Sequence, residues 1–292
     1  MPVVVTIGTI LLEGFGMDAN DVAKKLARGG RVHELSGNSG RTFRLFAPHA
    51  TTILTVYRSA SLQRREQRAL ESLADVDGLP KVIEWGIEED HSWGLFEDAG
   101  AWNLATLPAS ASAARQAGRI LRSVHEASPD DLTNLAGGMD AAWLRSEYQS
   151  VFSRLGRYRR RVGMSQRLLE MALAAEPPVG GVPTSCHTNP RPELFRVDDE
   201  TGRVTLVDWG WATAAPAEWD FSLAVWTLRR STGMSAAGAL IEGYGRTMPE
   251  EILRPWIVFH SGREMMQAAE HSDGRLGRLA PIVEELEASL LE

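Results

Sequence analysis

The spacing of apolar residues divides the chain into a first third rich in short strands and a remainder rich in helices. Between residues 32 and 96, short runs of β-branched and apolar residues are separated by turn residues, which is typical of an antiparallel sheet. One charged amphipathic helix interrupts these runs. The predicted strands of this part are 32–35, 42–46, 51–57, 81–85 and 92–96, and its predicted helices are 18–26 and 62–73.

Beyond residue 101 the apolar positions recur with the period of an α-helix. A stretch rich in proline and glycine, residues 177–183, separates two groups of such segments. A short hairpin, 194–197 with 204–207, is expected between the groups. The predicted helices are 111–127, 141–156, 165–175, 220–230, 236–244, 250–269 and 281–291.

The length and composition fit a soluble protein with two lobes. A chain of 292 residues is too long for one minimal core. With 43% hydrophobic and 24% charged residues it has enough apolar surface to offset the entropy of ordering the chain. We therefore predict an α+β protein, with a β-rich lobe over residues 1–98 and a mostly helical lobe over residues 99–292.

Charge, cysteine content and hydropathy exclude several classes of partner. A net charge of −7 repels polyanions, so nucleic acid is not an expected partner. Cys186 is the only cysteine, which rules out an intrachain disulfide and fits the reducing cytoplasm. We find neither a secretory leader pattern nor a run of about 18 apolar residues, so a membrane location is not expected either. Only three of the 31 basic residues are lysines, a bias typical of a GC-rich bacterial genome.

Several motifs follow one another in a fixed order along nearly the whole chain. Together they resemble the aminoglycoside phosphotransferase and choline kinase family, which has a protein-kinase-like fold. The resemblance implies ATP, magnesium, and a small molecule or peptide in a cleft between two lobes, with a catalytic-loop-like segment at 184–211. The motifs are the glycine turn Ser36-Gly-Asn-Ser-Gly40, the helix around Glu66, the segment Phe96-Glu-Asp98, the helix ending at His125, and the pair Cys186-His-Thr-Asn-Pro190 and Leu206-Val-Asp-Trp-Gly210.

The nucleotide-binding part of the pattern is incomplete. The resemblance places Gly37, Ser39 and Gly40 at the phosphates, although a glycine turn also serves any hairpin. The family's phosphate-binding lysine falls on Thr55, which carries no charge. Glu66, which pairs with that lysine in the family, is retained.

The catalytic and metal positions are altered as well. The family's catalytic aspartate, two residues after His187, is Asn189 here, and its metal-binding asparagine falls on Leu194. Asp208 matches the second metal ligand and is the candidate metal residue, with a purely structural role as the alternative. We expect His187 to orient backbone groups rather than to transfer protons. Asp220 is expected to cap a helix and to brace the His187 loop.

Three functions compete. The first is a pseudokinase that binds a peptide, a small molecule or a partner enzyme in a bacterial pathway, such as one for modified peptides or antibiotics. The second is a lyase that eliminates phosphate from a phosphorylated peptide, with Arg58, Arg191 and His187 at the phosphate ester. The third is an active small-molecule kinase in which Glu193 or Asp198 takes the role of the base. On the first hypothesis ATP and magnesium bind weakly or not at all.

Overall fold

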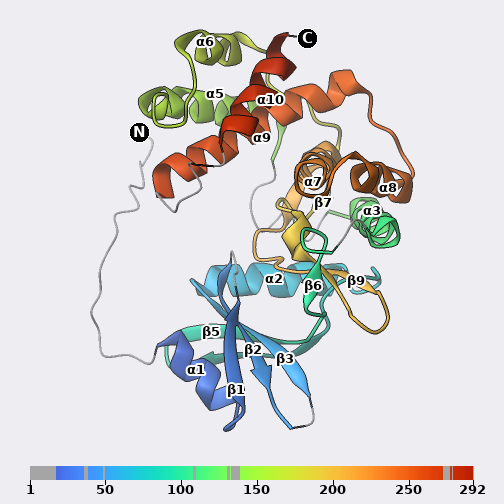
Figure 1. The fold of residues 1–292 in the computed structure, drawn as a ribbon. Helices are drawn as coiled ribbons and strands as arrows, with labels where there is room; N and C mark the ends of the chain where they lie inside the picture. The colour runs from blue at the N-terminus through green and yellow to red at the C-terminus, as the bar shows by residue number, and fades with distance from the viewer. Residues whose placement is uncertain are drawn as a thin grey trace. The chain divides into compact units, whose positions relative to one another are not determined.

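The chain divides into two compact units in the computed structural model (Figure 1). The first unit is Met1–Ala60 with Val82–Asp98, and the second is Ser61–Lys81 with Ala99–Glu292. The structure describes residues 18–35, 39–48, 50–107, 110–129, 132, 139–271, 277 and 279–291.

The first unit is a five-stranded antiparallel sheet covered by a short helix, α1 (Ala19–Leu26). Val22 and Ala23 of the helix are fully buried with Phe43 and Leu54 of the sheet, because the apolar face of each element needs a partner. The side chain of Asp18 caps the helix by accepting a hydrogen bond from the backbone of the second helical residue. The strands, in the order β1-β2-β3-β5-β4, are β1 (Arg31–Leu35), β2 (Gly40–Phe46), β3 (Thr51–Tyr57), β4 (Val82–Glu88) and β5 (His91–Glu97).

Strands β2 and β3 approach each other closely at Gly40. A Cβ atom at this position would lie 2.1 Å from the carbonyl oxygen of Val56 on β3. Any larger residue would push the strands apart, so packing alone requires a glycine here.

The second unit is mostly helical and is built around large aromatic side chains. Trp219, Trp256 and Phe259 are fully buried and pack edge to face or tilted against one another. None of the helices in the described part of the chain is both long and apolar enough to cross a bilayer. The helices are α2 (Ala60–Ser72), α3 (Ala111–Glu126), α5 (Ala141–Tyr158), α6 (Gln166–Ala174), α7 (Ala217–Thr232), α8 (Met234–Tyr244), α9 (Glu250–His271) and α10 (Ala280–Leu291).

Two small sheets in the second unit hold the segment 184–211. Strands β7 (Pro183–Cys186) and β10 (Thr213–Pro216) pair antiparallel, and β6 (Trp102–Asn103), β8 (Phe195–Val197) and β9 (Val204–Leu206) form the other sheet. One loop leaves the end of β7 and reaches β8 through a single turn of 3₁₀ helix, Pro192–Leu194. The other loop connects β9 to β10.

The observed elements confirm the expected α+β class, an antiparallel sheet followed by a mostly helical remainder. Strands β6, β7 and β10 were not expected from the sequence. They are two to four residues long, and β7 starts at the end of the stretch rich in proline and glycine, so no alternation marks them.

Candidate functional site

The first loop begins with a buried histidine, His187, that directly follows β7. Its Nε2 donates to the carbonyl oxygen of Val207 at 2.9 Å, and its Nδ1 accepts from the backbone nitrogen of Asn189 at 3.3 Å. These two partners require the neutral tautomer that is protonated on Nε2. Burial lowers the pKa of His187, which keeps the ring neutral. Both ring nitrogens therefore serve the loop's own structure.

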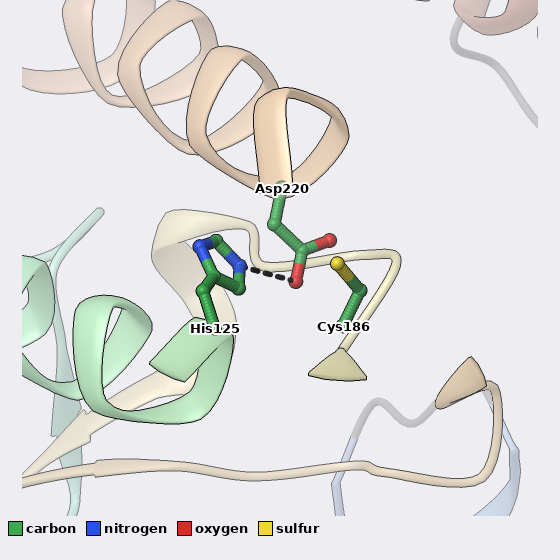
Figure 2. A group of neighbouring side chains, drawn as sticks. All are labelled: His125, Cys186 and Asp220. Carbon is green, nitrogen blue, oxygen red and sulfur yellow. Dashed lines mark hydrogen bonds and ion pairs between the residues drawn. The ribbon is translucent and has the colours of Figure 1, made fainter. Parts of the chain in front are cut away.

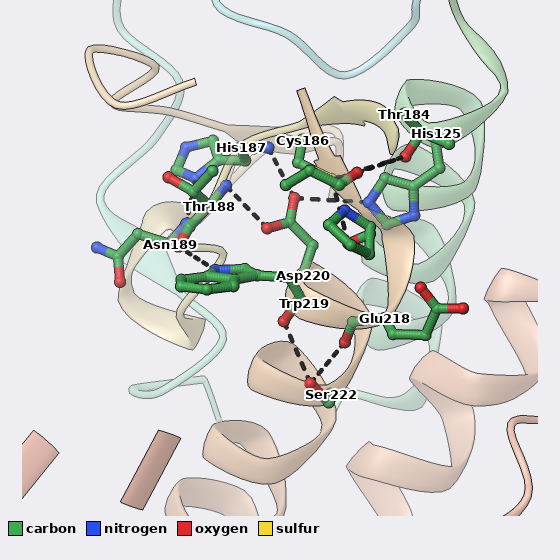
Figure 3. A network of polar contacts seen from close by, with 12 residues as sticks. His125, Thr184, Cys186, His187, Thr188, Asn189, Glu218, Trp219, Asp220 and Ser222 are labelled. Carbon is green, nitrogen blue, oxygen red and sulfur yellow. Dashed lines mark hydrogen bonds and ion pairs between the residues drawn. The ribbon is translucent and has the colours of Figure 1, made fainter. Parts of the chain in front are cut away.

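Asp220, in the first turn of α7, holds the same loop in place (Figure 3). Its Oδ2 accepts from the backbone nitrogen of His187 at 2.7 Å, and its Oδ1 accepts from that of Thr188 at 2.8 Å. The expected brace is therefore present. The expected helix cap is wrong, because the residue at the N-cap position is Pro216 and Asp220 lies inside the helix. Thr188 has a left-handed φ of 69°, and these hydrogen bonds compensate for that strain.

Three potential metal ligands meet beside this brace: His125, Cys186 and Asp220 (Figure 2). One ligand atom from each lies within 4.8 Å of the others. The ring nitrogens of His125 contact Tyr244 Oη at 2.9 Å and Asp220 Oδ2 at 3.5 Å, and Cys186 Sγ donates to the carbonyl oxygen of Ala215 at 3.3 Å. Burial and the carboxylate of Asp220 raise the pKa of the Cys186 thiol, so it stays protonated. Because their donors and acceptors are engaged internally, these residues form a structural network.

Asn189, which is expected at the position of the family's catalytic aspartate, lies at the end of the network away from His125 (Figure 3). Arg191 donates from Nε to Asn189 Oδ1 at 3.0 Å and from Nη2 to Glu264 Oε2 at 2.5 Å. The side-chain oxygen of Asn189 is thus oriented toward a cation. Its remaining group is an NH₂, which can donate a hydrogen bond but cannot take a proton from a hydroxyl group.

The residues expected at the family's metal positions, Leu194 and Asp208, do not fit a magnesium site. Mg²⁺ requires oxygen ligands in near-octahedral geometry. Leu194 is 9% exposed and offers only a backbone carbonyl, which accepts from the backbone nitrogen of Val207 at 3.0 Å. Asp208 is half-buried, has a left-handed φ of 72°, and carries the one carboxylate at these positions. A single carboxylate does not supply the expected set of ligands.

Glu66, on α2, contacts the loop that follows Asp208. It is 3% exposed, and its Oε1 accepts from the backbone nitrogen of Trp209 at 3.0 Å. The indole of Trp209 is fully buried and meets the ring of His187 edge to face, with 4.7 Å between the ring centroids. Trp211 is exposed, and the guanidinium group of Arg65 lies 5.9 Å from its ring centroid. Of the two tryptophans beside Asp208, one belongs to the core and the other to the surface.

The candidate residues of the first unit are described separately from those of the second. Ser39 is buried, and its carbonyl oxygen accepts from the backbone nitrogen of Arg58 at 3.2 Å. Arg58 itself is exposed. Thr55 is half-buried on β3 between Thr42 and Gly94 of the neighbouring strands. The expected phosphate ligand Gly37 lies outside the described residues, whereas Gly40 makes the close strand contact given above.

The two alternative bases have different surroundings. Asp198 begins the turn between β8 and β9, where its Oδ1 accepts from the backbone nitrogens of Glu200 and Thr201 and from the hydroxyl of Thr201. These hydrogen bonds lower the pKa of Asp198, which suits a turn residue better than a general base. Glu193 is exposed on the 3₁₀ turn.

Sequence reasoning missed three charged residues of α7 and α9, one of which, Glu264, is the ion-pair partner of Arg191. Glu264 and Arg263 lie on α9 and Arg230 in the last turn of α7, far from the recognised motifs. No spacing rule connects them to residue 191. These residues come near the loop only because α7 and α9 pack beside it in the folded chain.

Comparison with known proteins shows which family this chain is similar to. Residues 32–254 match the model of the phosphotransferase enzyme family, which covers more than half of the chain. We find no match among proteins of curated function.

Solved structures of phosphotransferases share the fold. A spectinomycin phosphotransferase in complex with ADP and spectinomycin is 15% identical, with a TM-score of 0.60 over 94% of this chain and 98% of that one. A macrolide 2'-phosphotransferase from Brachybacterium faecium is 17% identical, with a TM-score of 0.63 over 91% and 98%. A choline kinase from Streptococcus pneumoniae is 15% identical, with a TM-score of 0.62 over 93% and 98%. These similarities confirm the expected protein-kinase-like fold.

Proposed function

The chain belongs to the phosphotransferase enzyme family, and we propose that it is a member whose kinase fold serves ligand binding after phosphoryl transfer has been lost. The ligand is a small molecule, a peptide or a partner enzyme of a bacterial pathway. Relatives in the comparison bind ADP with spectinomycin or with hygromycin B. In this chain we propose that ATP and magnesium bind weakly or not at all. The single cysteine supports a cytoplasmic location.

The contact between Arg191 and Asn189 is the main support for this proposal. Phosphoryl transfer requires a group that orients the attacking hydroxyl and cations that neutralise the phosphates. At the position expected for the orienting group, the side-chain oxygen of Asn189 accepts a hydrogen bond from Arg191 at 3.0 Å. At the position expected for one metal ligand, the residue is Leu194. Loss of the base position and of a metal ligand together should lower the rate by several orders of magnitude.

Phosphorus NMR of the protein with Mg²⁺ and ATP at comparable concentrations tests the loss of transfer. The proposal expects no more ADP from the native protein than from the Asp208→Ala variant, in the presence of candidate hydroxyl acceptors. ADP formation that Asp208→Ala abolishes would instead identify an active kinase of altered geometry. Thermal denaturation of both proteins checks that each is folded.

A phosphate-eliminating lyase is the second candidate. The guanidinium group of Arg191, on the loop that carries Asn189, favours it, because arginine suits a phosphate ester. The two hydrogen bonds of the His187 ring count against that residue as its acid or base. Incubation with a phosphoserine peptide, followed by mass spectrometry, tests this function. The lyase predicts loss of phosphoric acid from the peptide, whereas unchanged peptide excludes the reaction for that substrate.

A further inference from the structure

Several guanidinium groups gather beside Asn189, all of them in the second unit. Arg191 is ion-paired with Glu264 on α9 at 2.5 Å. Arg263 precedes Glu264 on α9, and the indole of Trp219 beside its guanidinium group donates to the carbonyl oxygen of Thr188 in the loop at 2.8 Å. Arg230, in the last turn of α7, lies over Trp226, and the rings of Trp226 and Trp219 both pack against His260. The three arginines therefore come from three different elements of the fold that meet beside the loop.

Arg263 is the least compensated member of this group. Its guanidinium carbon lies 4.5 Å from the ring centroid of Trp219 and 5.9 Å from that of Phe259. Among the described residues, no carboxylate lies within ion-pair distance of it. Burial, with Arg191 as a further cause, lowers the pKa of Arg263 to about 10, although Glu147 and Glu264 oppose that shift. A mostly buried cation that stacks on aromatic rings without an ion-pair partner gains much from an added anion.

Arg230 has an aromatic neighbour as well, but unlike Arg263 it lies near a carboxylate. Arg230 stacks on Trp226, 4.9 Å from its ring centroid, and its Nε lies 4.0 Å from Glu285. Arg229 is also ion-paired with Glu285.

We propose that Arg191, Arg230 and Arg263 form a subsite for the anionic group, phosphate or carboxylate, of a small-molecule ligand. Arg191 and Arg230 keep about a quarter of their side-chain surface exposed, so a ligand can reach them. The NH₂ group of Asn189 supplies an additional donor to the bound anion. Guanidinium groups bind such oxygens in pairs of parallel hydrogen bonds. The inference rests on the proposed function insofar as it treats this loop as a ligand site.

Calorimetric titration with orthophosphate and, separately, with succinate tests the subsite, at constant ionic strength and without nucleotide or magnesium. The native protein is expected to bind at least one of the two anions saturably. Arg263→Met and Arg191→Gln should each weaken that binding about tenfold or more, since each removes charge-assisted hydrogen bonds. Arg157→Gln, an exposed arginine on α5, is the matched control and should bind as the native protein does. If Arg263→Met does not fold, Arg191→Gln carries the test.

Three results would overturn the subsite. They are the lack of saturable binding of either anion, an equal loss of affinity in Arg157→Gln, and unchanged affinity in Arg191→Gln. Because nucleotide is omitted, ADP formation in the NMR experiment would refute the loss of phosphoryl transfer without affecting the anion titration. Failure of one proposal is thereby distinguishable from failure of the other.

Discussion

The carboxylate of Glu66 accepts a hydrogen bond from the backbone nitrogen of Trp209 at 3.0 Å. The resemblance to the family predicts that this glutamate pairs with a lysine, and it places Thr55 at the position of that lysine. The retained carboxylate thus has a structural task, which is to fix the residue that follows Asp208. Retention of a family residue is therefore no proof that its catalytic role persists.

Replacing Glu66 by alanine should destabilise the second unit by about 1–3 kcal/mol, because a buried backbone N–H loses its acceptor. Urea denaturation followed by circular dichroism measures the change. Glu71→Ala, an exposed position on the same helix, is the control and should cost far less. Equal losses at the two positions would mean that the contact with Trp209 contributes little.

Replacing Asp220 by asparagine should lower the free energy of unfolding by about 2–4 kcal/mol, which is more than the loss expected for Glu66→Ala. The carboxylate accepts one backbone N–H on each oxygen, and an amide can accept only one of them, which leaves a buried donor facing an NH₂ group. Asp198→Asn, in the exposed turn between β8 and β9, is the control. Thermal denaturation should show a much larger drop in Tm for Asp220→Asn than for Asp198→Asn. A drop of equal size in the two variants would contradict the role of Asp220 in holding the loop.

Stability should fall as the pH drops below neutrality. Burial lowers the pKa of both His187 and His260, and the guanidinium groups of Arg263 and Arg191 lower that of His260 further. The unfolded chain binds protons near its ordinary histidine pKa of about 6.5, while the folded chain binds them only at lower pH. The free energy of unfolding should therefore decrease below about pH 6.5, by up to about 1.4 kcal/mol per pH unit for each buried histidine.

The pH slope can be tested with one variant. In His260→Gln the free energy of unfolding should depend less steeply on pH between about pH 6.5 and pH 5, because one buried histidine no longer titrates. This holds whatever the effect of the substitution on absolute stability. Urea denaturation at several pH values measures it, with His33→Gln on the exposed face of β1 as the control. A slope that is unchanged in His260→Gln would show that this ring does not contribute.

Restoring the aspartate at position 189 should not restore catalysis. In Asn189→Asp the new carboxylate would pair with Arg191. Leu194 would still supply no side-chain ligand for a metal, and Thr55 would still supply no positive charge for the phosphates. We expect ADP formation at the background level in phosphorus NMR. A rise of about a hundredfold or more, the scale of general-base catalysis, would show that residue 189 alone limits the reaction.

Most of the fold could be predicted from the sequence, but only part of the candidate site. Hydrophobic periods located the long elements, since the burial of one face repeats along a strand or a helix. The predicted substitutions at Asn189 and Leu194 rest on the flanking motifs, which set their positions in the chain. The group formed by Arg191, Arg230 and Arg263 was not visible, because Arg230 and Arg263 lie on two helices that are distant from the loop in the sequence. Local patterns contain no information about such contacts.

The dependence of ATP binding on magnesium tests the central claim most directly. Calorimetric titration of the native protein with ATP, with and without Mg²⁺, should give weak or undetectable binding that magnesium does not strengthen, and Asp208→Ala should leave it unchanged. Tight binding that requires magnesium and disappears in Asp208→Ala would contradict the loss of the phosphoryl-transfer site.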